Sequence, residues 1–92
     1  MNIYRVKFYA RCPQDGCSIQ YALTIHTGRV ILAEDIITAT EEIAEGMHEA
    51  IADRLVDALG GNQVLMATHQ GVEIETIRPS IAHWHKPAVS ER

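Results

Sequence analysis

The chain has 92 residues, of which 47% are hydrophobic, and a formal net charge of -4 at pH 7. A chain of this length forms one domain, and so small a domain favours association with other copies. The acidic balance argues against broad binding to a nucleic-acid backbone, which requires a basic face. No run reaches the roughly 18 apolar residues of a membrane span, and the first residues lack the layout of a signal peptide. Two cysteines are too few for a disulfide scaffold, so we expect a protein of the reducing cytoplasm.

The first third of the chain has the alternation that is typical of strands. Apolar side chains recur at every second position over residues 4–10 and again over residues 19–25. A period of two with one apolar face indicates a half-buried strand. Residues 12–17 lie between the two segments and contain a proline and a glycine, which reverse the chain. The two strands are therefore predicted to form a hairpin.

The period changes to that of helices over residues 33–59. Apolar or small side chains recur three or four positions apart in two sets: Ile36, Ile37, Thr40 and Ile43, then Met47, Ile51, Leu55 and Leu59. Gly46 lies between the sets, and a glycine inside a helix costs about 1 kcal/mol relative to alanine. Two helices that are broken near Gly46 are therefore favoured over one bent helix. The pair Gly60-Gly61 is a strong stop signal.

Two more strands are predicted over residues 63–68 and 72–77, with His69-Gln70-Gly71 as their turn. The expected fold is α+β: a four-stranded antiparallel sheet in ββααββ order, with the helices on one face. It occupies residues 1–79. Residues 80–92 form a C-terminal tail that carries His83-Trp84-His85.

Cys12 is the first candidate for chemistry. It ends the first strand beside Arg11, and a nearby cation raises the thiolate fraction of a cysteine, as a nucleophile requires. The alternative interpretation is a small, partly buried residue at a hairpin. Zinc could also bind Cys12 and Cys17 together with one of three histidines, His26, His48 or His69. The loose spacing between the cysteines and the lack of a second close pair argue against this, so no metal site is predicted.

His48 and Glu49 are the second candidate, because they open the predicted second helix. A helix N-terminus favours a carboxylate and offers free N–H groups to anions. Glu49 could accept hydrogen bonds from a donor-rich base, and His48 could transfer a proton near neutral pH. The alternative interpretation is that Glu49 only stabilises the start of the helix in solvent.

Three motifs follow one another along the chain: Arg11-Cys12-Pro13 after a strand, an acidic helix start at Glu34, and Met47-His48-Glu49. This pattern resembles the preQ0 (7-cyano-7-deazaguanine) nitrile reductases of the tunnelling-fold (T-fold) superfamily and their shorter archaeal amidinotransferase relatives. The resemblance covers roughly residues 4–78. It implies a Cys12 nucleophile that forms a covalent thioimide, with Glu49 recognising the base and His48 as the neighbouring acid. It also implies a ring of subunits with each site between neighbours.

The chain departs from those reductases at two places. They carry an aspartate seven residues after the cysteine, where this chain has Ile19, so Asp15 in the turn is the substitute candidate for substrate binding. They also carry a lysine-bearing helix start that holds the phosphates of NADPH, where this chain has Glu34 and Asp35. We therefore expect weak or absent NADPH binding, and both reduction and displacement by an amine stay open as the second step.

Two other functions remain open. One is a different purine or pterin enzyme of the same superfamily, similar to the zinc-dependent cyclohydrolases. The other is a small interaction protein without catalysis, with which the acidic charge and the missing cofactor lysines are compatible.

Overall fold

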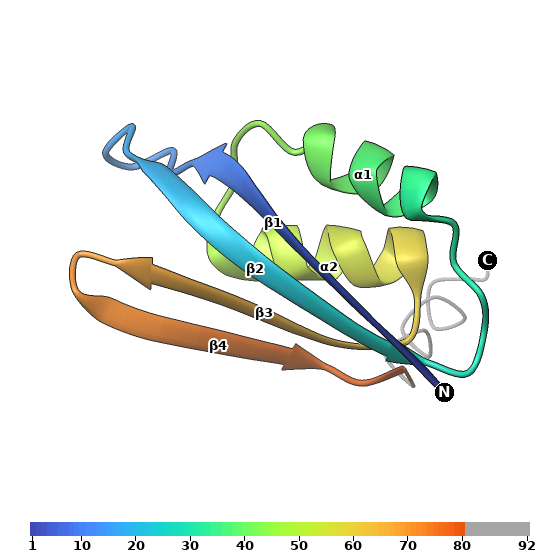
Figure 1. Ribbon diagram of the computed structural model, residues 1–92. Helices are drawn as coiled ribbons and strands as arrows, with labels where there is room; N and C mark the ends of the chain where they lie inside the picture. The colour runs from blue at the N-terminus through green and yellow to red at the C-terminus, as the bar shows by residue number, and fades with distance from the viewer. Residues whose placement is uncertain (81–92) are drawn as a thin grey trace, which may run out of the picture.

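The computed structural model describes residues 1–80. In chain order its elements are β1 (Asn2–Arg11), β2 (Ser18–Thr27), α1 (Ala33–Glu41), α2 (His48–Leu59), β3 (Asn62–His69) and β4 (Val72–Arg78). The four strands form one antiparallel sheet in the order β1-β2-β3-β4 (Figure 1). The predicted α+β fold and its ββααββ order are therefore confirmed. None of the described helices combines the length and apolar character needed to cross a membrane. The His83-Trp84-His85 motif of the predicted tail lies outside the described residues.

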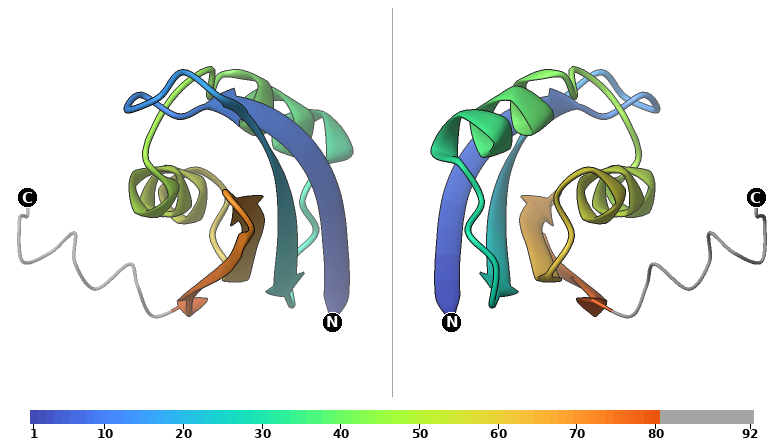
Figure 2. Two further views of the ribbon diagram at one scale, coloured as in Figure 1. Left: turned by 90° about the vertical axis from the view of Figure 1, so that its left-hand side faces the viewer. Right: turned by 90° about the vertical axis from the view of Figure 1, so that its right-hand side faces the viewer.

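The core fills the space between the sheet and the helices. Every second side chain of a strand points to the same face, and on β2 these side chains are buried throughout. Figure 2 shows α2 on the concave side of the curved sheet. There it contacts β3 and β4, while α1 contacts β1 and α2. The most deeply buried large side chains are Tyr21, Leu23, Ile25, Ile51, Leu55 and Leu65.

The helical segment is divided near Gly46, as the sequence indicates. α1 ends at Glu41, residues 42–47 connect the helices, and α2 begins at His48. Gly46 also lies close to α2, because a Cβ atom at this position would lie 3.1 Å from Cγ1 of Ile51. Close packing is thus a second reason for the glycine. Two side chains that the period places on the buried faces are partly exposed instead, Ile37 and Met47, each at 47%.

The end of α2 is fixed by two side chains that donate hydrogen bonds to its backbone carbonyls. The Leu59 carbonyl accepts a hydrogen bond of 3.1 Å from Nη2 of Arg29. Nε2 of the buried Gln63 donates to the carbonyls of Leu55 and Gly60, at 3.1 and 2.7 Å. The bond from Arg29 satisfies one of the last carbonyl groups of α2, which have no partner inside the helix. The two bonds from Gln63 tie the start of β3 to the last turn of α2 and its C-cap. The turn into β3 that follows is narrow and uses Gly61 at a φ of 77°.

We predict that Gly61→Ala destabilises the fold more than Gly71→Ala. Both glycines have positive φ, 77° and 82°, so alanine at either costs about 1–2 kcal/mol of backbone strain. At Gly61 the new Cβ would also lie 2.9 Å from Cγ2 of Ile25, whereas Gly71 has nothing within 4 Å. Overpacking of this kind adds about 1–3 kcal/mol. Urea unfolding of the two variants measures the difference in the free energy of unfolding. Equal losses would show that the chain relaxes around the added methyl group.

Candidate functional site

Cys12 follows the end of β1 and is held there by backbone hydrogen bonds on two sides. Its N–H donates to the carbonyl of Cys17 at 2.8 Å, which closes the turn over residues 12–17. On the other side the N–H of Arg11 donates to the Ala44 carbonyl at 2.9 Å, and the Gly46 N–H donates to the Arg11 carbonyl at 3.1 Å. The connection between the helices is thereby drawn against the end of β1. Cys12 lies where these segments meet and is only 4% exposed.

A pocket of about 100 Å³ lies beside Cys12. It is bounded by the turn over residues 12–17, the start of α2 and the end of the hairpin of β3 and β4. Its lining residues include Cys12, Tyr21, Gly46, His48, His69 and Ile74. Cys12 and His48 were predicted as site residues and His69 was considered as one of three alternative zinc ligands, and the fold brings all three to one pocket.

Asp15 and His69 form a polar cluster with Cys12. The thiol sulfur, a carboxylate oxygen of Asp15 and a ring nitrogen of His69 all lie within 4.8 Å of one another. Asp15 accepts a hydrogen bond of 2.9 Å from the Cys17 N–H. Its other oxygen accepts one of 3.0 Å from Nε2 of His69, which must carry the proton because a carboxylate only accepts. The cluster therefore joins the two turns of the sheet across β2.

The conformation of the second turn places its side chains over Asp15. Gln70 has a φ of 55° and Gly71 a φ of 82°, as a tight two-residue hairpin turn requires. Nε2 of Gln70 then donates a third hydrogen bond to Asp15, at 3.3 Å.

These hydrogen bonds determine the charge of the cluster. The backbone N–H of Cys17 and, next, the ring of His69 hold the pKa of Asp15 well below its usual range, with smaller contributions from the thiols of Cys17 and Cys12. The Asp15 carboxylate in turn raises the pKa of Cys17. Burial raises the pKa of Tyr21, and Cys12 adds to this. Asp15 is thus a fixed negative charge beside Cys12.

His48 is the first residue of α2, and its ring is oriented by two contacts. Nε2 donates to the Leu65 carbonyl at 3.1 Å, and the ring meets Tyr21 edge-on with centroids 5.4 Å apart. In a neutral ring this leaves Nδ1 as an acceptor. Nδ1 is buried and has no partner among residues 1–80. Buried polar atoms of this kind are rare and call for a ligand or a water molecule.

Glu49 lies outside this pocket within one chain. Its side chain is 82% exposed and lies 3.6 Å from Nη2 of Arg78 on β4. Arg78 also contacts Asp53 at 2.7 Å, and this carboxylate is the main cause of the raised pKa of Arg78. Glu49 therefore faces the free edge of β4, whereas Cys12, Asp15 and His48 lie together.

Glu34 and Asp35 lie far from Cys12. The N–H of Ile31 donates to the Tyr4 hydroxyl at 3.0 Å, which places the start of α1 beside the start of β1. Cys12 follows the other end of this strand, about 30 Å away at the usual rise per residue. Groups at the start of α1 cannot act on Cys12 of the same chain.

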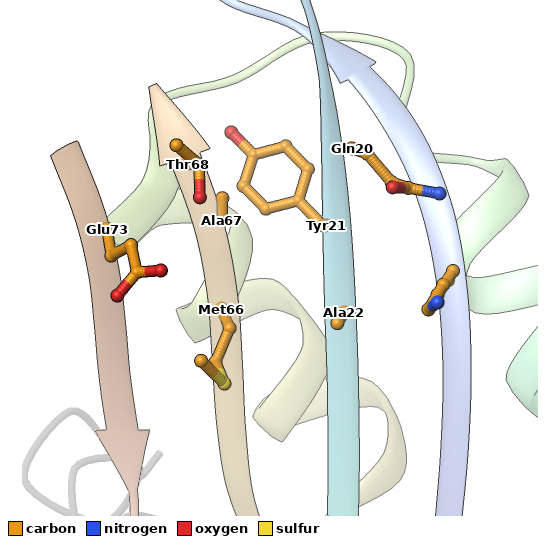
Figure 3. A pocket seen from close by; sticks show the side chains of 8 residues that line it. Gln20, Tyr21, Ala22, Met66, Ala67, Thr68 and Glu73 are labelled. Carbon is orange, nitrogen blue, oxygen red and sulfur yellow. The ribbon is translucent and has the colours of Figure 1, made fainter. Parts of the chain in front are cut away.

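The outer face of the sheet carries opposite charges on its two edge strands. The exposed side chains of β1 include Arg5, Lys7 and Arg11, whereas those of β4 include Glu73 and Glu75. Between them lies a shallow hollow of about 250 Å³ (Figure 3). Gln20, Met66 and Thr68 lie on this side of β2 and β3.

We predict that Asp15→Asn lowers the pKa of Cys17. The carboxylate opposes ionisation of the thiol, so its removal makes Cys17 react faster at a given pH. The rate of alkylation is measured against pH by intact mass in a Cys12→Ser background, which leaves Cys17 as the sole thiol. Glu73→Gln, which removes an exposed carboxylate on the outer face, is the matched control and should leave the profile unchanged. An unchanged profile for Asp15→Asn would refute the coupling.

No protein-family model, no curated protein and no solved structure matches this chain. The T-fold resemblance and the function that it implies therefore rest on the motifs, and they are carried forward as a proposal.

Proposed function

We propose that this protein is a T-fold enzyme that captures a 7-deazaguanine nitrile, such as preQ0, as a covalent thioimide at Cys12. The observation that carries the proposal is the pocket itself, which Cys12, His48 and His69 line from separate segments, with Asp15 hydrogen-bonded to His69 beside it. A nucleophilic thiol next to a base, with a further group holding both in place, is the arrangement that covalent catalysis requires.

The step adds the thiol across the carbon–nitrogen triple bond. The sulfur of Cys12 bonds to the nitrile carbon, one bond of the triple bond breaks, and the thiol proton ends on the nitrogen. His48 is the proton carrier in this proposal, because Nδ1 is free to accept while Nε2 is fixed on the Leu65 carbonyl. Nothing leaves, so the adduct has the combined mass of the protein and the ligand.

Asp15 has a supporting role in this proposal. Its carboxylate already accepts hydrogen bonds from Cys17, His69 and Gln70, so little of it is left for a base. It fixes the turn that carries Cys12.

A neighbouring chain completes the proposed site. The pocket of about 100 Å³ is smaller than the roughly 300–1,000 Å³ that ligand clefts usually provide, so a bicyclic base would extend beyond it. Glu49, the residue expected to recognise the base, faces the edge of β4. A second chain that docks on this edge would bring its own Cys12 pocket toward Glu49.

The order of the strands permits such docking by rotation alone. β1 and β4 run in opposite directions in the sheet, so β1 of a second chain, turned about an axis along the strands, meets β4 in the antiparallel sense. Repetition of this contact gives a ring when its rotation closes, as the proposed assembly requires. The basic side chains of β1 then face the acidic side chains of β4, and both free edges are covered.

The second step of the reaction is either reduction of the thioimide or its displacement by an amine. Reduction requires a hydride from NADPH, for whose phosphates the start of α1 offers Glu34 and Asp35 in place of lysine. Displacement by an amine requires no such cofactor, and we favour it for this reason. Either path requires free thiols, as both cysteines are here, and thus a reducing compartment such as the cytoplasm.

We expect preQ0 to add the mass of one ligand to each reactive chain, as measured by intact mass spectrometry. Cys12→Ala should abolish the adduct, because the nucleophile is gone, while Cys17→Ala should retain it. Glu49→Gln should weaken capture by about 2–4 kcal/mol, because the amide cannot accept two N–H donors as a carboxylate does. An adduct that survives Cys12→Ala, or the absence of any adduct from folded protein, would contradict the proposal.

Co-expression of the Cys12→Ala and Glu49→Gln variants tests whether the site lies between subunits. In mixed rings about a quarter of the contacts would join an intact Cys12 to an intact Glu49 of another chain, so capture should return in proportion. Light scattering of the wild type should give several times the mass of one chain. A site within one chain predicts no recovery, and a monomer at micromolar concentration would exclude the ring.

A further inference from the structure

Cys12, Asp15 and His69 supply three different donor atoms that zinc binds in proteins: a thiolate sulfur, a carboxylate oxygen and an imidazole nitrogen. They come from the end of β1, the first turn and the end of β3, and their donor atoms lie within 4.8 Å of one another. We propose that this cluster binds Zn²⁺ or a similar borderline-soft divalent cation. The inference stands on the donor atoms and does not depend on the proposed nitrile chemistry.

The distances require only small movements. With the usual zinc bond lengths and tetrahedral angles, an oxygen and a nitrogen ligand lie about 3.3 Å apart, and sulfur lies about 3.6 Å from either. Nε2 of His69 and Oδ2 of Asp15 are 3.0 Å apart, so they separate by a few tenths of an ångström. The sulfur, which lies within 4.8 Å of both atoms, approaches by at most about 1.2 Å.

The protons also balance. The metal takes the place of the proton between His69 and Asp15, and the ring of His69 carries its proton on Nδ1 instead. Cys12 releases its thiol proton on binding, so affinity should rise with pH. Asp15 needs no deprotonation, because its carboxylate already accepts hydrogen bonds from Cys17, His69 and Gln70.

The surroundings of the cluster suit a bound ion. Oδ1 of Asp15 is held by the N–H of Cys17 and its other oxygen by Gln70, so the carboxylate keeps its orientation after His69 exchanges a hydrogen bond for a metal bond. Three protein ligands leave a fourth position open. Cys12 and His69 line a pocket that His48 also lines, and the unpartnered Nδ1 of His48 could accept a hydrogen bond from a water bound in that position.

This donor set differs from the one that the cysteine spacing suggests. Cys17 is exposed, and its sulfur is not among the three donor atoms that lie within 4.8 Å of one another. Its backbone N–H donates to Asp15. Asp15 therefore takes the place that a second cysteine would hold. A zinc ion here also occupies the sulfur of Cys12, so a bound metal and the capture of a nitrile exclude each other.

The test is titration of metal-free protein with Zn²⁺ by calorimetry, and with Co²⁺ by absorption, where a thiolate-to-cobalt band reports the sulfur directly. We expect one ion per chain. Cys12→Ser, His69→Gln and Asp15→Asn should each weaken binding by more than about 100-fold, beyond the roughly 10- to 100-fold that loss of an outer partner costs. Gln70→Ala should fall within that smaller range.

Cys17→Ala and His26→Ala are the matched controls, because they remove a thiol and an imidazole outside the cluster, and they should bind as the wild type does. Circular dichroism verifies that each variant is folded. Zinc affinity that is unchanged in folded Cys12→Ser, or that is lost in Cys17→Ala, would overturn the inference.

Capture of preQ0 in the presence of a chelator separates this inference from the proposed function. Cys12-dependent zinc binding without capture supports the metal site and removes the nitrile chemistry. Capture without zinc binding does the reverse. If the protein both binds zinc and captures preQ0, stoichiometric Zn²⁺ should suppress the adduct and the chelator should restore it. An adduct that forms equally well with zinc bound would overturn the assignment of Cys12 as a ligand.

Discussion

The backbone hydrogen bonds of Arg11 are the constraint on which the candidate site depends. The last residue of β1 exchanges bonds with Ala44 and Gly46, in addition to its pairing with β2. The connection between the helices therefore pairs with the end of β1 as a short parallel bridge, in which Glu45 lies opposite Arg11. This fixes where α2 begins, and so places His48 over the same pocket as Cys12. A longer or displaced connection would leave both residues in place in the sequence and separate them in space.

The strands and helices follow from local patterns, which is why the fold could be predicted. Each of these patterns extends over only a few residues. They are the alternation along β1 and β2, the glycines that end α2, and the four-residue spacing of Ile51, Leu55 and Leu59. The two residues that the pattern wrongly placed in the core have different reasons for their exposure. Met47 continues the spacing of α2 but precedes its first turn, and Ile37 lies beside the buried face of α1 marked by Ile36 and Thr40.

The chemistry of the site depends on distances that a local pattern does not contain. Cys12, Asp15 and His48 were predicted as site residues, and the fold gathers them, because each lies at the end of an element where chain reversals meet. His69 was named only as a turn residue and one of three alternative zinc ligands. Its partnership with Asp15 spans 54 positions and depends on β2 lying between β1 and β3. That strand order places the ends of β1 and β3 at the same end of the sheet, and knowledge of it would have pointed to His69. The place of Glu49 follows from Arg78, whose side chain draws it toward β4.

The division of charge between β1 and β4 gives the sheet an electric dipole that lies in its own plane. Two chains that approach by the same edge, β1 to β1 or β4 to β4, bring like charges together, so a two-fold dimer is opposed at either edge. The hydrogen-bonding groups of an open sheet edge would otherwise accept any extended chain. The dipole thus discourages symmetric pairs at either edge, and it favours the antiparallel contact of β1 with β4 that the proposed ring requires.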